Sequence, residues 1–313
     1  MVTLLKRQPA EVVIDRRYSQ TSITPSLPEY DLGHYAQLQS LSTAVSQSES
    51  SSLPDYDALD TSPSACSGAS AVTSFHNANA FQIETAGHPL FYLPLPPKAV
   101  PIPVYRVEAD GAVGEVVYES LRNKRSSGNC ALVRAGHGVS EAPVCSTTYR
   151  FGPGKSPQMH LHGRLDPNEV YQVQSKGLTT RAQSIRTHLG TFEWRYASRA
   201  DRKALGANSL LLFERVTTVT LVIGKQEERR AILGMFIRNS ELRTEGTRRC
   251  TAGNGGRLLL NLTEWSDSKV EHEQMEILAI SSCIVMLKKE VDRRRVQQIM
   301  AMSGGGGGGG GGG

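Results

Sequence analysis

Two histidines in the middle of the chain, His160 and His162, have the spacing of a pair of metal ligands. Side chains at i and i+2 of a β-strand point to the same face, so both imidazoles could bind one zinc or copper ion. No third ligand lies nearby in the sequence, and an ordinary strand with two surface or hydrogen-bonded histidines explains the pattern better. We therefore predict neither a metal site nor a cofactor.

The motif "GPGK", Gly152–Lys155, has the composition of a phosphate-binding loop but not its spacing. It lacks the G-x-x-x-x-G-K-[ST] pattern and a following helix, which favours a hairpin turn. The sequence also contains no G-x-S-x-G elbow, no H-E-x-x-H, no dinucleotide-binding fingerprint and no kinase set. We predict a non-enzymatic protein. A triad assembled from distant residues is the alternative, because geometry rather than sequence defines it.

Two tetrapeptides near the N-terminus have the residue types of a peptide ligand. "LPEY" comprises Leu27, Pro28, Glu29 and Tyr30, and "LPDY" comprises Leu53, Pro54, Asp55 and Tyr56. L-P-x-Y is similar to the ligands of WW domains, in which proline presets a polyproline-like backbone and tyrosine fills a neighbouring pocket. Two copies 26 residues apart would permit bivalent capture by tandem WW domains. The alternative is coincidence in a segment that contains Pro and Tyr.

Composition predicts three regions. Between Ser40 and Ser74 there are twelve Ser and three Thr with few large apolar residues, and such a segment buries too little surface to offset its ordering entropy. We expect residues 1–79 to form a disordered acidic tail and residues 80–302 to form one folded domain. The poly-Gly tail, residues 303–313, has almost no side chains to pack, so we expect it to be disordered.

Charge divides between the same regions. Residues 1–79 have a net charge of −4, which leaves +9 for the remainder. A basic folded part fits an anionic partner such as a lipid headgroup or nucleic acid. A solvated basic surface is the simpler interpretation, because no single Lys/Arg cluster is long. We expect no nucleic-acid partner.

The cysteines and the N-terminus indicate the compartment. Five Cys are scattered without a C-x-x-C pair, which predicts neither disulfides nor a zinc site. Reduced thiols are typical of the cytoplasm or nucleus. The first residues contain no apolar stretch of signal-peptide length, so we do not expect secretion.

Short strands dominate the part of the chain that is expected to fold, residues 80–302. Apolar or β-branched runs bounded by Gly, Pro, Asn, Ser or charge occur throughout. They are "AFQIET", "LFYLPL", "IPVYRVE", "GEVVYESL", "CALVRA", "STTYRF", "QMHLHG", "TFEWRYA", "SLLLFER", "VTLVIG", "AILGMFI" and "RLLLNLTEW". In "TFEWRYA", Phe192, Trp194 and Tyr196 alternate with Glu193 and Arg195, which predicts a half-buried strand with an aromatic core face. About a dozen strands without intervening helices favour an antiparallel sandwich or barrel.

Only the C-terminal part is expected to be helical. From Lys269 to Met302 there is neither Gly nor Pro, and Asp267 with Ser268 offers an N-cap. The charge-free run Ile277 to Leu287 is too short to span a bilayer, which needs about 20 apolar residues. It is apolar around its whole circumference, and such a helix is usually enclosed by protein. We therefore predict a closed antiparallel barrel of about 12 strands around this helix, with no transmembrane segment.

This combination resembles the tubby C-terminal-like superfamily, which includes tubby domains, phospholipid scramblases and LURP-one-related proteins. Four patches are similar to fungal members of unknown function: "RFGPGKSP" (Arg150–Pro157), "TFEWRY" (Thr191–Tyr196), "SLLLFER" (Ser209–Arg215) and "MLKKEVDRRR" (Met286–Arg295). The resemblance implies a barrel that engages membranes through phosphoinositides or handles lipids. No motif aligns with tubby's lipid-binding residues, and the scramblases' Cys-rich segment and calcium site do not occur. The lipid-binding residues therefore stay unknown.

Two functional hypotheses follow. The first is a cytoplasmic lipid-binding module that acts at a membrane surface through its basic face. The second is an adaptor or ubiquitylation client that WW domains bind through the two L-P-x-Y motifs. Localisation is expected to be cytoplasmic, with a peripheral membrane or nuclear site as the alternatives.

Overall fold

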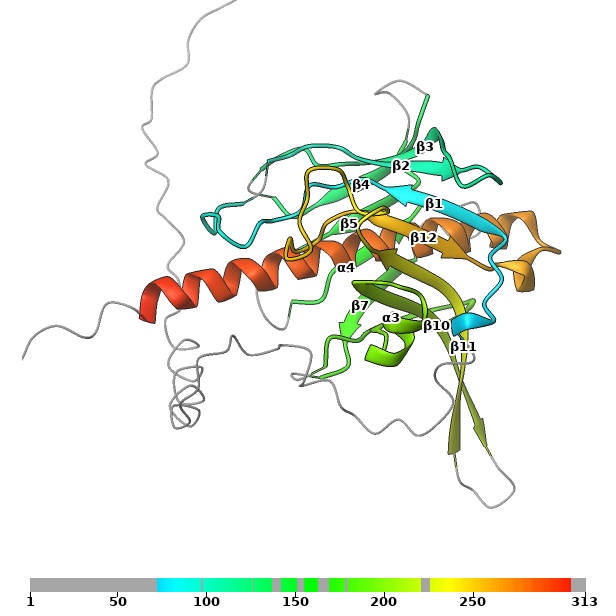
Figure 1. Ribbon diagram of the computed structural model, residues 1–313. Helices are drawn as coiled ribbons and strands as arrows, with labels where there is room; N and C mark the ends of the chain where they lie inside the picture. Colours follow the sequence, from blue (N-terminus) through cyan, green and yellow to red (C-terminus); the bar gives the residue numbers. More distant parts are fainter. Residues whose placement is uncertain are drawn as a thin grey trace, which may run out of the picture. The chain divides into compact units, whose positions relative to one another are not determined.

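Twelve antiparallel strands close into a barrel in which neighbours in sequence are neighbours in space, and β1 lies between β12 and β2 (Figure 1). The computed structural model describes residues 72–304 except 97, 126, 137–141, 151–154, 163–168, 178–179 and 221–225. The strands are β1 (Asn79–Ile83), β2 (Ile102–Val107), β3 (Val113–Leu121), β4 (Cys130–Arg134), β5 (Cys145–Thr148), β6 (Gln158–Leu161), β7 (Val170–Ser175), β8 (Gln183–Thr187), β9 (Gly190–Tyr196), β10 (Ser209–Thr220), β11 (Gln226–Arg238) and β12 (Gly256–Leu260). The predicted closed antiparallel barrel is confirmed.

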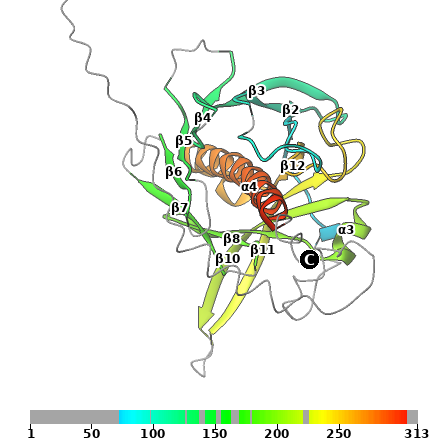
Figure 2. The ribbon, with the colours of Figure 1, turned by 90° about the vertical axis from the view of Figure 1, so that its left-hand side faces the viewer.

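The long helix α4 (Lys269–Gly304) passes through this barrel, as the view along its axis shows (Figure 2). Ser268 begins it, because its hydroxyl accepts a hydrogen bond from the Glu271 N–H at 3.4 Å. Every residue from Gln274 to Leu287 is buried, so this stretch has no solvent-facing side. The prediction that the barrel encloses the apolar run is therefore confirmed, and none of the described helices is long and apolar enough to cross a bilayer.

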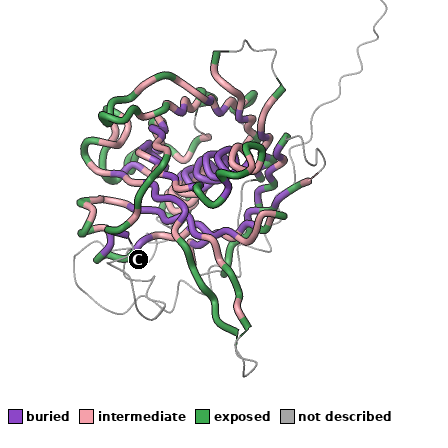
Figure 3. Tube along the Cα trace, turned by 90° about the vertical axis from the view of Figure 1, so that its right-hand side faces the viewer, coloured by how far each residue is buried: buried purple, intermediate pink, exposed green. Residues whose placement is uncertain are grey.

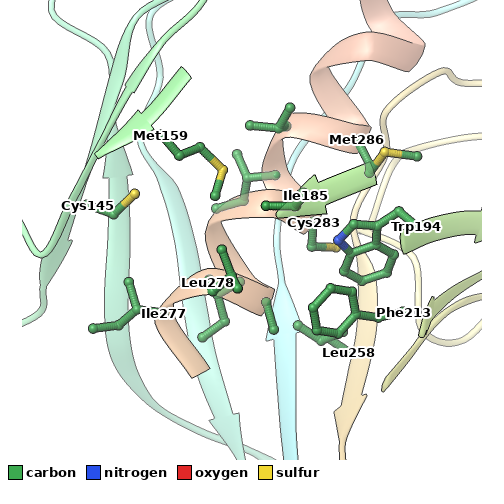
Figure 4. Close-up of a cluster of buried hydrophobic side chains, with 14 of the residues drawn as sticks. Cys145, Met159, Ile185, Trp194, Phe213, Leu258, Ile277, Leu278, Cys283 and Met286 are labelled. Atoms are coloured by element: carbon green, nitrogen blue, oxygen red, sulfur yellow. The ribbon is translucent and has the colours of Figure 1, made fainter. Parts of the chain in front are cut away.

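Aromatic side chains of the wall pack directly on the helix (Figure 4). Phe213 of β10 stacks on Trp194 of β9, with ring centroids 4.9 Å apart. The indole Nε1 of Trp194 donates to the Ser282 hydroxyl of α4 at 2.8 Å, and that hydroxyl donates to the Leu278 carbonyl at 2.6 Å. Ser282 is fully buried. Its polar group is thus satisfied inside the barrel, which avoids the cost of an unpaired hydroxyl.

The alternation in β9 is confirmed, with one addition. Phe192 and Trp194 have no exposed surface, and Tyr196 packs against the core. Glu193 points away from the core but is only 3% exposed. Lys176 and Arg230 cover it, with N···O distances of 2.7 and 3.2 Å to its carboxylate.

Three details of the strand prediction are wrong. The run "LFYLPL", Leu90–Leu95, forms no strand, because Pro89, Pro94 and Pro96 lack the N–H groups that a ladder requires. "SLLLFER" and the start of "VTLVIG" belong to one strand, β10, whose far half and that of β11 form exposed arms (Figure 3). β7 and β8 were not predicted, because their sequences "VYQVQS" and "QSIRT" are mostly polar.

A second, smaller apolar cluster lies on the outside of the wall. Val72 packs there against Leu210 and Leu212 of β10 and Met235 of β11. The connection between β9 and β10, which contains the short helix α3 (Arg199–Ala204), contributes Leu205 to the same cluster. This cover explains why the first half of β10, Leu210 to Glu214, is buried on both of its faces.

Enclosure of α4 leads to the first prediction. Ile284→Asp places an unpaired carboxylate in the barrel interior, where Ile284 is 5% exposed. We expect the cooperative thermal transition to be lost, because the penalty of several kcal/mol is a large part of the usual stability of about 5–15 kcal/mol. Circular dichroism measures this. The control is Ile299→Asp in the same helix, 38% exposed, which should melt like the wild type; equal melting of both variants would contradict enclosure.

Candidate anion-binding site at the exit of the helix

A buried ion pair fixes α4 at the end of the barrel where the helix leaves it, here called the exit end. Arg238, the last residue of β11, donates from Nη1 and Nη2 to the two carboxylate oxygens of Glu290 at 2.6 and 2.7 Å. The Tyr196 hydroxyl and the Gly253 N–H also donate to this carboxylate. Burial alone would raise the pKa of Glu290, but the charge and hydrogen bonds of Arg238 lower it to about 2. The pair therefore stays ionised.

Gly253 allows the connection between β11 and β12 to lie directly on the helix. Its φ is +65°, and a Cβ there would lie 2.5 Å from the Leu287 carbonyl oxygen and 2.6 Å from Val291 Cγ2. Only glycine fits both the left-handed backbone and this distance. The connection is thus one wall of the exit end.

Two lysines of α4, Lys288 and Lys289, lie where the helix emerges from the barrel. Lys288 Nζ donates to the Gly128 carbonyl and lies 4.1 Å from the centroid of the Tyr149 ring. Lys289 Nζ donates to Gln183 Oε1 at 2.6 Å. Burial, with a smaller contribution from neighbouring arginines, lowers the pKa of both lysines to about 8. Each is a cation that is partly removed from water, and a bound anion would favour its charged form.

Arginines surround these lysines. Arg295 donates to the Pro94 carbonyl at 3.3 Å, and Arg294 donates to the Cys250 carbonyl at 3.3 Å. Arg122 and Arg125, which follow β3, donate to the carbonyls of Lys98 and Pro96. These carbonyl oxygens are neutral, so the contacts orient the guanidinium groups without cancelling their charge. The set is called the exit cluster: Arg122, Arg125, Lys288, Lys289, Arg293, Arg294 and Arg295.

The acidic residues in this part of α4 offset only part of that charge. Glu290 is neutralised by Arg238, and Asp292 accepts from Arg295 at 3.3 Å. The helix macrodipole does not account for the cations either, because its effect is confined to the last turn. Lys288 to Arg295 lie two or more turns before the end at Gly304. The seven cations of the exit cluster therefore outnumber the two acidic residues, Glu290 and Asp292, in this part of α4.

The opposite end of α4 is acidic. Glu271, Glu273 and Glu276 lie in its first turns, and Glu264 and Asp267 lie just before it. Arg134 pairs with Glu273, and the Tyr118 hydroxyl donates to Glu276 at 2.9 Å. The charge of the helix thus changes sign along the barrel axis. The basic segment of the helix lies at the exit end, where its charge attracts anions.

Some of the predicted site residues lie outside the described part of the chain. These are the six WW-ligand residues Leu27, Pro28, Tyr30, Leu53, Pro54 and Tyr56, as well as Gly152 to Gly154 of "GPGK". Their proposed functions stay predictions. Lys155 is described and exposed.

The two histidines lie on one face, as predicted. The rings of His160 and His162 have centroids 4.3 Å apart, and His162 Nε2 lies 2.7 Å from the Ser146 hydroxyl. Burial, followed by the nearby His160, lowers the pKa of His162. Within the ranges that the structure describes, no group of three His, Cys, Asp or Glu side chains could hold a metal ion.

Comparisons of the chain with protein-family models, with curated proteins and with solved structures found no match. The exit cluster was not predicted as a site, although one signal was visible: the apolar run of α4 has three Glu shortly before it and five Lys or Arg shortly after it.

The Arg238–Glu290 pair predicts a specific pH dependence. The folded pKa of Glu290, about 2, lies below the ordinary 4.5, so the carboxylate stabilises the fold at neutral pH and this contribution disappears as the pH falls from about 5 to about 2. Glu290→Gln should lower the free energy of unfolding by about 3 kcal/mol at neutral pH, because Arg238 is left unpaired, and should flatten the acid limb. Urea denaturation at several pH values measures both. Glu271→Gln is the control. An unchanged acid limb in Glu290→Gln would show that other groups cause it.

Proposed function

We propose that this protein is a non-enzymatic module that binds anionic membrane surfaces, phosphoinositide-containing ones included, through the exit cluster. The observation behind the proposal is the gathering of five cations from eight residues of α4, Lys288–Arg295, with two arginines that follow β3. Cations near an anionic bilayer contribute about 1 kcal/mol each. The set is large enough for peripheral binding.

The chemistry of the cluster suits phosphate groups. Arginine presents a planar fork of donors that matches phosphate oxygens, and lysine supplies a compact charge. Lys288 and Lys289 have pKa values lowered to about 8 by burial, so a phosphate beside them relieves the cost of keeping them charged. We therefore favour headgroups with exposed phosphates over weakly charged surfaces.

The architecture agrees with the resemblance to the tubby C-terminal-like superfamily. A closed antiparallel barrel of twelve strands around a C-terminal helix is what that resemblance implies. Membership of this superfamily, and a relationship to its fungal members, are part of the proposal. Cytoplasmic localisation at the membrane face follows from it.

A second function is supported by a separate observation, the repetition of L-P-acidic-Y at Leu27–Tyr30 and Leu53–Tyr56. Under this proposal, the N-terminal region recruits WW-domain proteins, and the chain is an adaptor or a ubiquitylation client. Two linked motifs raise the effective concentration of the second binding event. The two functions are compatible, because they use different parts of the chain.

Vesicle flotation of the full chain tests the membrane proposal. We expect flotation with phosphatidylserine and phosphoinositide vesicles at low salt, less at physiological salt because of screening, and none with neutral vesicles. Arg293→Glu with Arg294→Glu should weaken it at least about thirtyfold. The matched control, Arg186→Glu with Arg229→Glu, reverses two exposed arginines of β8 and β11. Equal loss in both variants, or salt-insensitive binding of the wild type, would reject the exit cluster as the site.

A pull-down with a tandem WW-domain protein tests the second proposal. Tyr30→Ala with Tyr56→Ala should abolish capture of the full chain, because tyrosine fills the specificity pocket. Each single variant should retain weaker capture, since one motif remains. Tyr18→Ala with Tyr35→Ala changes two tyrosines that lie outside L-P-x-Y and is the control. Capture of the double motif variant at the wild-type level would exclude this function.

A further inference from the structure

The segment between β1 and β2 exposes apolar side chains in succession. Phe91 is 91% exposed, and Tyr92, Leu93 and Leu95 are 56%, 59% and 47% exposed. Single exposed apolar residues are common on protein surfaces, but a continuous group of them usually marks an interaction site. Residues 90–95 are called the apolar loop.

Side chains of α4 and of the segment after β3 donate hydrogen bonds to backbone carbonyls of the apolar loop and of Pro96, which follows it. Arg295 donates to the Pro94 carbonyl at 3.3 Å, and Arg125 donates to the Pro96 carbonyl at 2.9 Å. Gln298 of α4 donates to the Leu90 carbonyl at 2.8 Å. These contacts satisfy backbone oxygens and leave the side chains of the loop directed to solvent.

A buried histidine fixes the start of the loop. His88 is 2% exposed, its Nε2 donates to Gln298 Oε1 at 2.8 Å, and its backbone pairs with Ala252. The ring of Tyr92 meets the His88 ring edge-on, with centroids 5.6 Å apart. The exposure of Phe91 and Leu93 therefore belongs to a segment with defined anchors at several points.

The loop and the exit cluster occupy the same end of the barrel. Arg295 of the cluster donates to the Pro94 carbonyl of the loop. Arg125 and Arg122 donate to the carbonyls of Pro96 and Lys98, which follow the loop directly. This end of the barrel thus combines cations, which anionic headgroups attract, with exposed apolar side chains, and interfacial membrane-binding surfaces combine the same two features. Phe and Tyr are suited to that interface, because their rings tolerate its polarity gradient.

We propose that the apolar loop inserts Phe91 and Leu93 into the interface of an anionic membrane while the exit cluster contacts the headgroups. The inference rests on the proposed membrane function and specifies how that surface is bound. Charge complementarity selects an anionic bilayer as the occupant, because Arg295 and Arg125 bind the backbone of the segment whose apolar side chains are exposed. Binding thereby has a part that salt screens and a part that salt does not screen.

Substitution of the loop tests this proposal. Phe91→Ser with Leu93→Ser in the full chain should weaken binding to phosphatidylserine vesicles about tenfold or more and should remove the part that persists at about 0.5 M salt. The control is Val113→Ser with Val170→Ser, two residues that are 50% and 52% exposed at the starts of β3 and β7. It should bind like the wild type. All variants should melt like the wild type, because the changed side chains lie outside the core.

A second variant reports insertion directly. Phe91→Trp adds an exposed indole to a chain whose two tryptophans, Trp194 and Trp265, are buried. Brominated lipids should quench its fluorescence, and Val113→Trp should stay unquenched under the same conditions. If the wild type binds anionic vesicles but the serine variant binds equally and the Phe91→Trp indole is not quenched, insertion is wrong and the membrane function stands. If the wild type binds no vesicle, the proposed function itself fails.

Discussion

The structure depends on one constraint: a helix that is apolar on every side has to be removed from water on every side. Ile277 to Leu287 meet this condition inside a wall with no free strand edge. The polar groups within the wall follow from the same constraint. Ser282 is paired with Trp194, and Glu276 with Tyr118, because unpaired polar groups there would oppose enclosure.

Enclosure also determines where charge gathers. A helix that fits the barrel only over its apolar run has to place the residues on either side of that run at the two openings. The acidic turns before Ile277 and the basic turns after Leu287 are thereby separated along the axis of the barrel. The Arg238–Glu290 pair fixes the helix at the exit, so Lys288 to Arg295 emerge at a defined position. There they meet the connections that contain Arg122 and the apolar loop.

Periodicity and run length predicted the parts of the fold that are local in sequence. The length and polarity of the run Ile277 to Leu287 were enough to predict an enclosed helix, and alternation in β9 identified Phe192 and Trp194 as core. Contacts between distant residues were not predictable. Arg238 and Glu290 lie 52 positions apart. The alternation in β9 places Glu193 on the solvent side, and only the structure shows that Arg230 covers it. The apolar loop was predicted as a strand, because hydropathy alone does not distinguish an apolar run that is buried from one whose side chains face solvent.

Hydrogen exchange of the full chain, alone and with phosphatidylserine vesicles, tests most directly the claim that an enclosed helix presents a membrane-binding exit end. The account predicts slow exchange of residues 274–287 in both states, because opening them requires loss of the barrel. It also predicts that vesicles add protection at residues 88–98 and 122–125. Fast exchange of residues 274–287 would contradict enclosure, and protection that instead appeared at the connection between β2 and β3 would place the membrane at the wrong end.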